Sequence, residues 1–528
     1  MLSQLALRER LEKLNAIGIA LSGETDTVRL TESILLAAKH LVRADAGTLY
    51  RVRDGALHFE IVITDSLGLA IGGSSGRAVS LPPVPLHDPD GAPNLHNVVA
   101  CAVNQGGTIV IDDAYTALGY DFSGTRHFDA ANHYRSKSFL CVPMRNHEGE
   151  LIGALQLINA LDDAGVVRAF DDDDRQLAES LASQAAIALT NRHLIQSLEE
   201  LFESFIGLIN LAIDDKSPYT SGHCQRVPEL TMMLAEAASR TRSGPLAEFG
   251  MSDKDRYELK IAGLLHDCGK VTTPVHVVDK ATKLQTLFDR IALIETRYEV
   301  IRRDVEIARL KGELGETAAD AQLAQLTDEL DFLRGINVGG EAMSEADLAR
   351  LAAIATRTWL GPNGVSPRLS ENELENLSVR RGTLTAAERQ IINHHIEVTI
   401  QMLEALPWPK HLKNVPEYAG GHHERMDGRG YPRGLTREQM SVQARIMGIA
   451  DVFEALTARD RPYKPGMKLS QSLLILARMA REQHVDPDLF EVFVRERVWL
   501  EYAQHYLPCE QIDEVDVDAV VALARAPM

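Results

Sequence analysis

The alternation of apolar and polar positions divides the chain into two regimes. Between about residues 45 and 159, short apolar runs such as LHFEIVI and SFLCVPM are separated by turn sequences such as Asp54-Gly55, which predicts antiparallel strands. Helical periodicity precedes these runs over Leu5–Leu41, follows them over Asp172–Leu211, and continues almost to the end of the chain. The pattern predicts a multidomain fold: an α+β domain, with an antiparallel sheet and flanking helices, followed by an all-α domain.

One long helix is expected to join the two domains. No Gly or Pro interrupts the sequence between Asp171 and Ile206. After Asn191 the apolar residues alternate at four- and three-residue spacing, which is the spacing of a coiled-coil seam; they are Leu194, Leu198, Leu201, Phe205 and Leu208. Two interpretations remain open. The helix either packs on its own domain or forms a parallel two-helix seam in a homodimer, through which a sensor could act on an effector.

A second seam of this kind extends over Leu287–Val305, and a further helix is expected over Leu323–Leu333. Together they predict a helical hairpin with a turn at Gly312–Gly315. Its many charged residues are interpreted as a solvated face. A polar helical extension, with loops at Gly361–Pro367, continues to about Arg381. The expected domains are 1–191, a connecting coiled-coil helix at 192–213, and 214–507 with a helical insertion at 286–380, followed by a C-terminal tail at 508–528.

Composition narrows the classes of partner. The chain has 55 Lys and Arg against 75 Asp and Glu, a formal net charge of -20 that would repel a nucleic-acid backbone. The longest apolar run, near Phe205–Ile213, is far shorter than the ~20 residues that span a bilayer, and the N-terminus has no signal-peptide cleavage pattern. The 5 cysteines form no disulfide framework. We therefore expect a reduced, cytoplasmic protein with neither nucleic-acid nor membrane partners.

Two carboxylates carry the first chemical signal. Asp267 and Asp451 are each expected within a strongly apolar helix, where an unpaired charge costs several kcal/mol. The nearby partners are histidines, which are unreliable cations at neutral pH, whereas a metal ion binds both neutral His and ionised Asp. Within a helix, His266 and Asp267 would project about 100° apart, so His266 could bind one ion while Asp267 bridges it to a second. A histidine-rich set favours iron, manganese or another transition metal over magnesium or calcium.

The order of the histidine motifs resembles the HD-GYP subgroup of the HD metal-dependent phosphohydrolases. The motifs are GHCQRV, HDCGK, INHHIEV, HHERMDGRGYP and ARIMGIADVFEAL, and the resemblance covers roughly Ile206–Leu507. It implies two transition-metal ions per chain, with iron favoured and manganese as the alternative. The implied ligands of the first ion are His223, His266, Asp267 and Asp451, and those of the second are Asp267, His395, His422 and His423. His395 is chosen over His394 because the family motif has a leucine eight residues after the ligand, and Leu403 fits that spacing.

The same resemblance implies the reaction, which is hydrolysis of cyclic di-GMP to pGpG and, in some members, on to GMP. Asp267 and Lys270 are the implied catalytic residues, with Lys270 also at the scissile phosphate. Arg461 and Lys464 match a family segment whose cations hold the substrate phosphates. Arg425 in the GYP loop either binds substrate or braces the loop, which is also a candidate site for a protein partner.

Two ions are expected rather than three. Family members with a third ion have a Glu four residues before the first ligand His, and this chain has Tyr219 there. A neutral phenol is a poor ligand for iron or manganese.

The N-terminal part resembles a GAF domain over about Leu14–Asn191, on RSKSFLCVPMRNHEGELIGALQLINA and FDDDDRQLAESLASQAAIAL. Asn159, Phe170 and Asp173 fit the signature of cyclic-nucleotide-binding GAF domains only loosely, and Ala160 replaces its Lys. This domain is therefore expected to bind an unknown small ligand or none. The predicted function is a cyclic di-GMP phosphodiesterase regulated by a GAF module. The alternatives are a catalytically weak cyclic di-GMP receptor that signals through the GYP loop, and a phosphohydrolase of another nucleotide.

Overall fold

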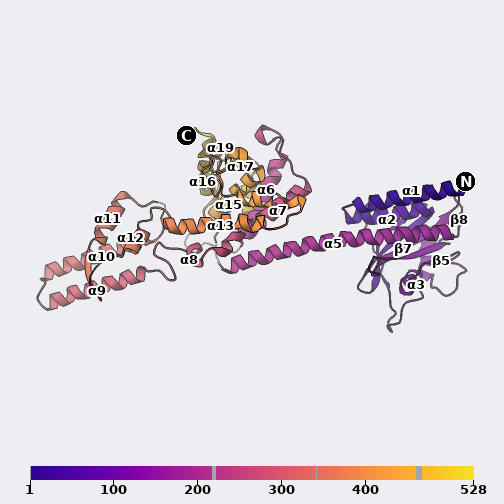
Figure 1. The fold of residues 1–528 in the computed structure, drawn as a ribbon, viewed down its shortest axis with the longest axis horizontal. Coiled ribbons are helices and arrows are strands. Elements are labelled where there is room, and N and C mark those ends of the chain that lie inside the picture. Colours follow the sequence, from indigo (N-terminus) through magenta and orange to yellow (C-terminus); the bar gives the residue numbers. More distant parts are fainter. Residues whose placement is uncertain (1, 217–221, 341, 460–465, 528) are drawn as a thin grey trace. The chain divides into compact units, whose positions relative to one another are not determined.

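The computed structural model describes residues 2–216, 222–340, 342–459 and 466–527, which form two compact units, Met1–Phe202 and Glu203–Met528 (Figure 1). The first unit is built on an antiparallel sheet with flanking helices, and the second is almost wholly helical. The predicted fold class is confirmed.

The sheet of the first unit follows the order β3-β2-β1-β7-β6-β5, and every pairing in it is antiparallel. Its strands are β1 (Ala44–Arg53), β2 (Ala56–Thr64), β3 (Leu69–Gly72), β5 (Ile109–Ile111), β6 (Phe139–Arg145) and β7 (Leu151–Leu161), with β4 (Val84–Pro85) paired to β2 and β8 (Val167–Arg168) paired to β7. The turn between β1 and β2 is Asp54-Gly55, and both residues have positive φ (48° and 74°), as a two-residue hairpin with the twist of its strands requires.

Each face of this sheet packs against its own helices. Leu155 and Leu157 of β7 join a core with α1 (Leu2–Gly23), α2 (Thr27–Val42) and the first turns of α5 (Asp172–Lys216), whereas Ala154 joins a core with α3 (Val98–Gln105) on the other face. This division follows from the period of two along a strand. A shorter helix, α4 (Ser123–Asn132), precedes β6.

Helix α5 is unbroken over 45 residues, as the sequence predicts. Its apolar seam is exposed in the single chain: Leu194, Leu198, Leu201, Phe205 and Leu208 are each between 55% and 70% exposed. Whether this seam forms the interface of a homodimer stays a prediction.

In the second unit, α6 (His223–Arg240) packs against α15 (Val442–Thr457) and against α7 (Asp253–Leu265). Its further helices are α8 (Val275–Val278), α13 (Ala386–Glu404), α14 (Val415–Gly420), α16 (Leu469–Arg481), α17 (Pro487–Arg495), α18 (Val498–Tyr506) and α19 (Val517–Arg525). Short 3-10 turns, among them η3 (Cys268–Thr272), connect them. The residues expected as a C-terminal tail contain α19, which packs against α16 and α17.

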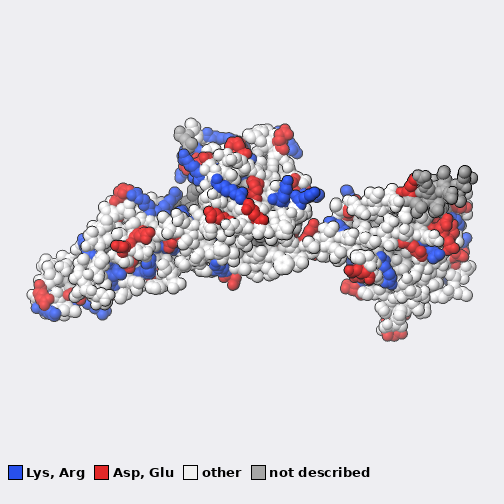
Figure 2. All heavy atoms as spheres, in the orientation of Figure 1, with Lys and Arg blue, Asp and Glu red and all other residues white. Residues whose placement is uncertain are grey.

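The insertion between the metal motifs has a core of its own. Helices α9 (Ile291–Leu310) and α10 (Glu316–Asn337) form the predicted hairpin and lie side by side (Figure 1). Their apolar stripes meet residues of α11 (Glu345–Ala355) and α12 (Glu371–Leu377) in one cluster. On the face in Figure 2, charges of both signs are interspersed over this part, as expected for a solvated surface.

One detail of the insertion was predicted wrongly. The segment Gly361–Pro367, expected to be loop, contributes to a small hairpin of β9 (Thr358–Gly361) and β10 (Gly364–Pro367). Strands of 4 residues are too short to show an alternating pattern in the sequence.

A buried lysine fastens the insertion to α13. The Lys280 side chain has no exposed surface, and its Nζ lies 2.7 Å from Glu388 Oε2 in the first turn of α13 and 2.8 Å from Asn376 Oδ1 of α12. Lys280 therefore links Asn376, near the end of the insertion, to the helix that carries His395.

We expect Glu388→Gln to lower the free energy of unfolding of the helical unit by about 3 kcal/mol, because it leaves the Lys280 charge buried without its counter-ion. Differential scanning calorimetry of the full chain measures the effect. The matched control is Glu397→Gln on the same helix, where the exposed pair with His394 is worth about 0–1 kcal/mol. Equal shifts in the two variants would contradict the role of Lys280.

Candidate metal centre

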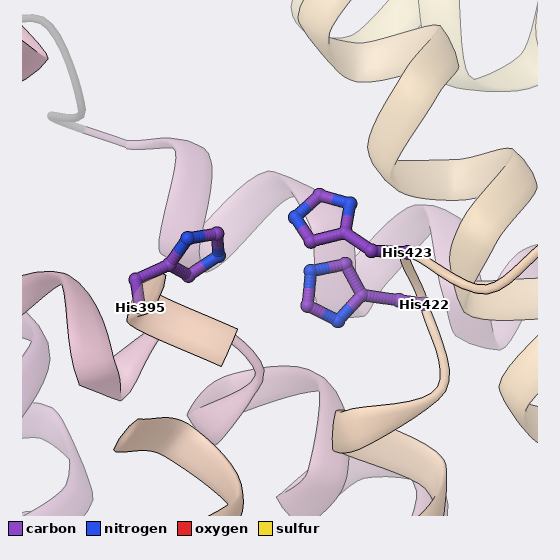
Figure 3. A group of neighbouring side chains, drawn as sticks. All are labelled: His395, His422 and His423. Atoms are coloured by element: carbon purple, nitrogen blue, oxygen red, sulfur yellow. The ribbon is translucent and has the colours of Figure 1, made fainter. Parts of the chain in front are cut away.

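Two groups of possible ligand atoms lie next to each other in the helical unit. In one, nitrogens of His395, His422 and His423 lie within 4.8 Å of one another, and their rings converge from α13 and from the segment after α14 (Figure 3). In the other, His223, His266 and Asp267 offer atoms within the same distance of one another. The structure thus brings together histidines that are up to 200 residues apart in the sequence.

Asp267 connects the two groups. Its Oδ2 lies 3.3 Å from His223 Nε2, and its Oδ1 lies 3.2 Å from His395 Nε2. Asp451, on α15, adds a second carboxylate, with Oδ1 at 3.3 Å from His223 Nε2. All seven residues that the sequence suggested as ligands therefore face one small volume, and the carboxylate of Asp267 presents one oxygen to each group.

The local geometry around Asp267 differs from the expectation. Helix α7 ends at Leu265, and Asp267 (φ -109°, ψ 11°) lies in the turn that begins η3, so the pair His266-Asp267 is not inside a helix. The 100° argument was wrong for this reason. His266 Nε2 and Asp267 Oδ2 lie 3.2 Å apart in the same group, and only the other oxygen of Asp267 faces the second group. Asp451 is inside a helix, as expected.

Gly269 and Thr399 allow the turn to approach α13, and sequence reasoning gave neither a role. A Cβ on Gly269 would lie 2.0 Å from the carbonyl oxygen of His395, so a side chain cannot fit there. The backbone N–H of Gly269 donates to Thr399 Oγ1 at 3.0 Å, and Thr399 is fully buried. The glycine of HDCGK could have indicated this contact in the sequence, because glycine often occurs where two backbones approach closely.

Both carboxylates stay ionised despite their burial. Burial raises the pKa of Asp267, but Lys270, His266 and His223 lower it further, so that the pKa lies well below its ordinary value. Lys270 Nζ is 2.5 Å from Asp267 Oδ2. For Asp451, burial is likewise outweighed by the hydrogen bond to His223 and by the nearby imidazoles, and its pKa is also depressed.

The histidines divide into two electrostatic classes. Burial lowers the pKa of His423 to about 4 and holds that of His422 well below its ordinary value, so both rings are neutral at pH 7 and keep a lone pair. Burial also acts to lower the pKa of His223, but hydrogen bonds to Asp267, Asp451 and Glu454 raise it well above the ordinary value. Without a metal, a proton on His223 thus supplies positive charge among three carboxylates.

The residues present fit a metal ion. Among the described residues, Asp267 Oδ1, His395 Nε2 and His422 Nε2 are buried and have no hydrogen-bond partner. Buried polar atoms left unpaired cost free energy, and one or two cations at this place would satisfy all three. Imidazole nitrogens with a minority of carboxylates are a donor set typical of transition metals.

The remaining predicted residues are placed as follows. Arg461, Lys464 and Tyr219 lie outside the described residues. Arg425 Nη2 is 3.1 Å from Asp427 Oδ2 and 3.4 Å from the carbonyl oxygen of Glu482, which are contacts that brace the loop. His394 is exposed and pairs with Glu397, as expected of a surface histidine.

Glu424 holds the GYP loop closed. It was not identified as a functional residue from the sequence. Its two carboxylate oxygens accept the backbone N–H groups of Arg433 (2.7 Å) and Leu435 (2.9 Å). A Cβ on Gly430 would lie 2.4 Å from the Cα of Glu424, so the loop folds tightly over this residue. The ring of Tyr431 then stacks on His423, with centroids 4.9 Å apart.

In the first unit, the residues weighed as a nucleotide-binding signature have structural roles. Asn159 is buried, its Oδ1 accepts the backbone N–H of Lys137 at 2.7 Å, and its Nδ2 donates to the hydroxyl of Tyr134 at 2.9 Å. The buried acid is Asp174 rather than Asp173, and it pairs with Arg168 at 2.6 Å.

Comparison with known families agrees with this architecture. A GAF domain model matches residues 26–189, and two HD domain models match residues 220–333 and 372–489. The chain combines a GAF domain with an HD domain. Its resemblance to HD-GYP phosphodiesterases with a GAF module is confirmed.

Three curated relatives illustrate the similarity of the GAF–HD chain. It is 34% identical over 149 residues to 3'3'-cGAMP-specific phosphodiesterase 3 of Vibrio cholerae, covering 28% of this chain and 30% of that protein. It is 37% identical over 114 residues to a cyclic di-GMP phosphodiesterase of Pseudomonas aeruginosa (22% and 26%), and 27% identical over 176 residues to one of Thermotoga maritima (33% and 45%). The matches span less than half the length of each of these relatives.

Among solved structures, the GAF domain of a phosphoenolpyruvate-protein phosphotransferase from Coxiella burnetii matches with a TM-score of 0.28 and 15% identity, over 36% of this chain and 96% of that one. Within the described residues, no helix has the length and apolar character needed to cross a membrane.

We expect Gly269→Ala to reduce metal affinity by about 10–100-fold, the loss typical when the groups that orient ligands are disturbed. The added Cβ must push η3 away from α13 and so separate Asp267 from His395. Metal content per chain, measured by inductively coupled plasma mass spectrometry after dialysis, tests this.

The control is Gly335→Ala, because Gly335 lies on α10 with nothing within 4 Å of its Cβ position. It should leave metal content unchanged. Normal loading of the Gly269 variant would show that the close approach does not build the site.

Proposed function

We propose that the GAF–HD protein is a dinuclear metal-dependent phosphodiesterase of the HD-GYP type that hydrolyses cyclic di-GMP, with either pGpG or GMP as the end product. The observation that carries this proposal is the position of Asp267, which presents one carboxylate oxygen to each of two groups of buried histidines. The names of the relatives support the substrate class, because they act on cyclic dinucleotides.

The proposed ligands are divided between two ions. His223, His266, Asp267 and Asp451 would hold the first, and Asp267, His395, His422 and His423 the second. Two bound cations, with iron favoured and manganese as the alternative, would activate water and polarise the phosphate. The neutral rings of His422 and His423 keep lone pairs for this purpose, and the stacked ring of Tyr431 fixes the orientation of His423.

Lys270 is the proposed catalytic cation. It places a half-buried positive charge beside Asp267, where it would offset the negative charge that develops on the phosphate during in-line attack. Arg461 and Lys464 are proposed to hold the substrate phosphates, and Arg425 to brace the GYP loop from which a protein partner could be recognised.

Incubation of the metal-replete full chain with cyclic di-GMP, followed by chromatography that separates pGpG from GMP, tests the proposal. The assay includes 3'3'-cGAMP as a second substrate, because some relatives are named for it. Faster turnover of 3'3'-cGAMP would replace the proposed substrate within the same class. Tight binding of cyclic di-GMP without turnover would favour a receptor.

We expect Lys270→Ala to lower turnover of cyclic di-GMP by about 10²–10³-fold with metal content retained, as for the loss of one charge-stabilising group. Lys254→Ala, on the exposed side of α7, removes the same charge away from the site and should leave turnover unchanged. Unchanged turnover in the Lys270 variant would remove it from the mechanism.

The GAF domain is proposed to regulate this activity through α5 in a homodimer. Leu198→Asp places a charge in the exposed seam and should raise the dimer dissociation constant at least about tenfold, equivalent to ~1.4 kcal/mol. Gln196→Asp adds the same charge on another face of α5 and should leave dimerisation intact. Sedimentation velocity measures both, and an unaffected Leu198 variant would exclude the seam as the dimer contact.

A further inference from the structure

Three of the buried histidines are oriented in the same way. Nδ1 of His266 lies 2.7 Å from the carbonyl oxygen of Gly263, Nδ1 of His395 lies 2.5 Å from that of Ile392, and Nδ1 of His422 lies 2.6 Å from that of Ala419. A carbonyl oxygen can only accept a hydrogen bond, so each Nδ1 must carry the proton. Each Nε2 therefore keeps its lone pair for a metal ion. In all three cases the acceptor is three residues earlier in the chain.

His223 obtains this orientation from a different element. It is the first residue of α6, so no earlier turn of the same helix can supply the carbonyl. Its Nδ1 instead lies 2.5 Å from Oε2 of Glu454 on α15. Glu454 is 1% exposed and follows Asp451 by three residues, which places both carboxylates on the same side of α15.

Arg226 fixes the carboxylate of Glu454 in turn. Its Nε donates to the second oxygen, Glu454 Oε1, at 2.7 Å. Arg226 lies three residues after His223 on α6, so the two residues contact both oxygens of Glu454 from the same helix. Gly222, which precedes His223, has a φ of 83°, a left-handed conformation that favours glycine at this position.

A carboxylate differs from a carbonyl as a partner for a ligand histidine. It is anionic, so it strengthens the hydrogen bond and makes the opposite ring nitrogen a better donor to a metal. That opposite nitrogen, His223 Nε2, faces Asp267 Oδ2 and Asp451 Oδ1, each at 3.3 Å. His223 belongs to the first group of ligands and not to the group of His395, His422 and His423.

We propose that Glu454 is a positioning residue that holds His223 with Nε2 toward the first metal ion, and that it controls the occupancy of that ion alone. This inference rests on the proposed metal centre but not on the proposed reaction.

The test measures binding of Mn²⁺ alone to the full chain, by equilibrium dialysis and by electron paramagnetic resonance. Wild-type protein should bind two ions as a magnetically coupled pair. Glu454→Ala should weaken one of them by about 10–100-fold and give the spectrum of an isolated ion. Glu454→Gln should lie between the two, because an amide oxygen still accepts from Nδ1 but carries no charge.

The control for a purely structural effect is Glu373→Ala. Glu373 is also buried and paired with an arginine, Arg297 at 2.9 Å, but it lies in the insertion. It should lower stability and keep the coupled pair. Full retention of two coupled ions in both Glu454 variants, or their equal loss in the Glu373 variant, would overturn the inference.

A measurement on the unaltered protein avoids dependence on variants that fold poorly. In a crystal structure of the Mn²⁺-loaded chain, His223 should bind through Nε2 with Nδ1 still on Glu454, and binding through Nδ1 would overturn the inference. Failure of the wild-type chain to bind Mn²⁺ would overturn the metal centre and this inference together. Two coupled ions without hydrolysis of a cyclic dinucleotide would contradict the proposed function alone.

Discussion

Burial of the Asp267 carboxylate is the constraint on which the rest of the helical unit depends. An ionised carboxylate out of water costs several kcal/mol unless cations or donors surround it. The fold meets this requirement with Lys270 of η3 and His223 of α6, which lie against Oδ2. His266 after α7 and His395 of α13 bring further ring nitrogens to the same carboxylate. The same arrangement that compensates one charge leaves two adjacent sets of nitrogen and oxygen atoms suited to a pair of metal ions.

Small residues make these approaches possible, and a large insertion does not disturb them. Gly269 lets η3 touch the backbone of α13, and Gly222 adopts the positive φ that leads into α6. The insertion lies between Asp267 and His395 in the sequence, and its apolar residues form a hydrophobic cluster of their own. Because Lys280 fastens its return to α13, the insertion does not need to contribute packing to the metal centre.

Local patterns in the sequence predicted what depends on neighbours along the chain. The unbroken α5, the α9–α10 hairpin and the antiparallel strands all follow from periodicity, and Asp267 and Asp451 stood out as carboxylates in apolar surroundings. The turn at His266-Asp267 and the hairpin at Gly361–Pro367 were missed because a few residues carry too little pattern. The role of Glu454 could not be inferred from the sequence, because it depends on contact with the imidazole of His223, which is 231 residues away in the chain.

The end of α5 reaches the turn that carries the catalytic candidates. Lys216, its last residue, donates from Nζ to the carbonyl oxygens of Lys270 (3.4 Å) and Val271. The backbone of η3 is also held on its other side by Thr399 and closely packed against His395. A shift or rotation of α5 would therefore pull on a segment that has little freedom to yield without moving Lys270 or Asp267. If the proposed regulation acts through this helix, a change in the position of this one turn would alter the charges around the shared carboxylate without a change in the ligand histidines themselves.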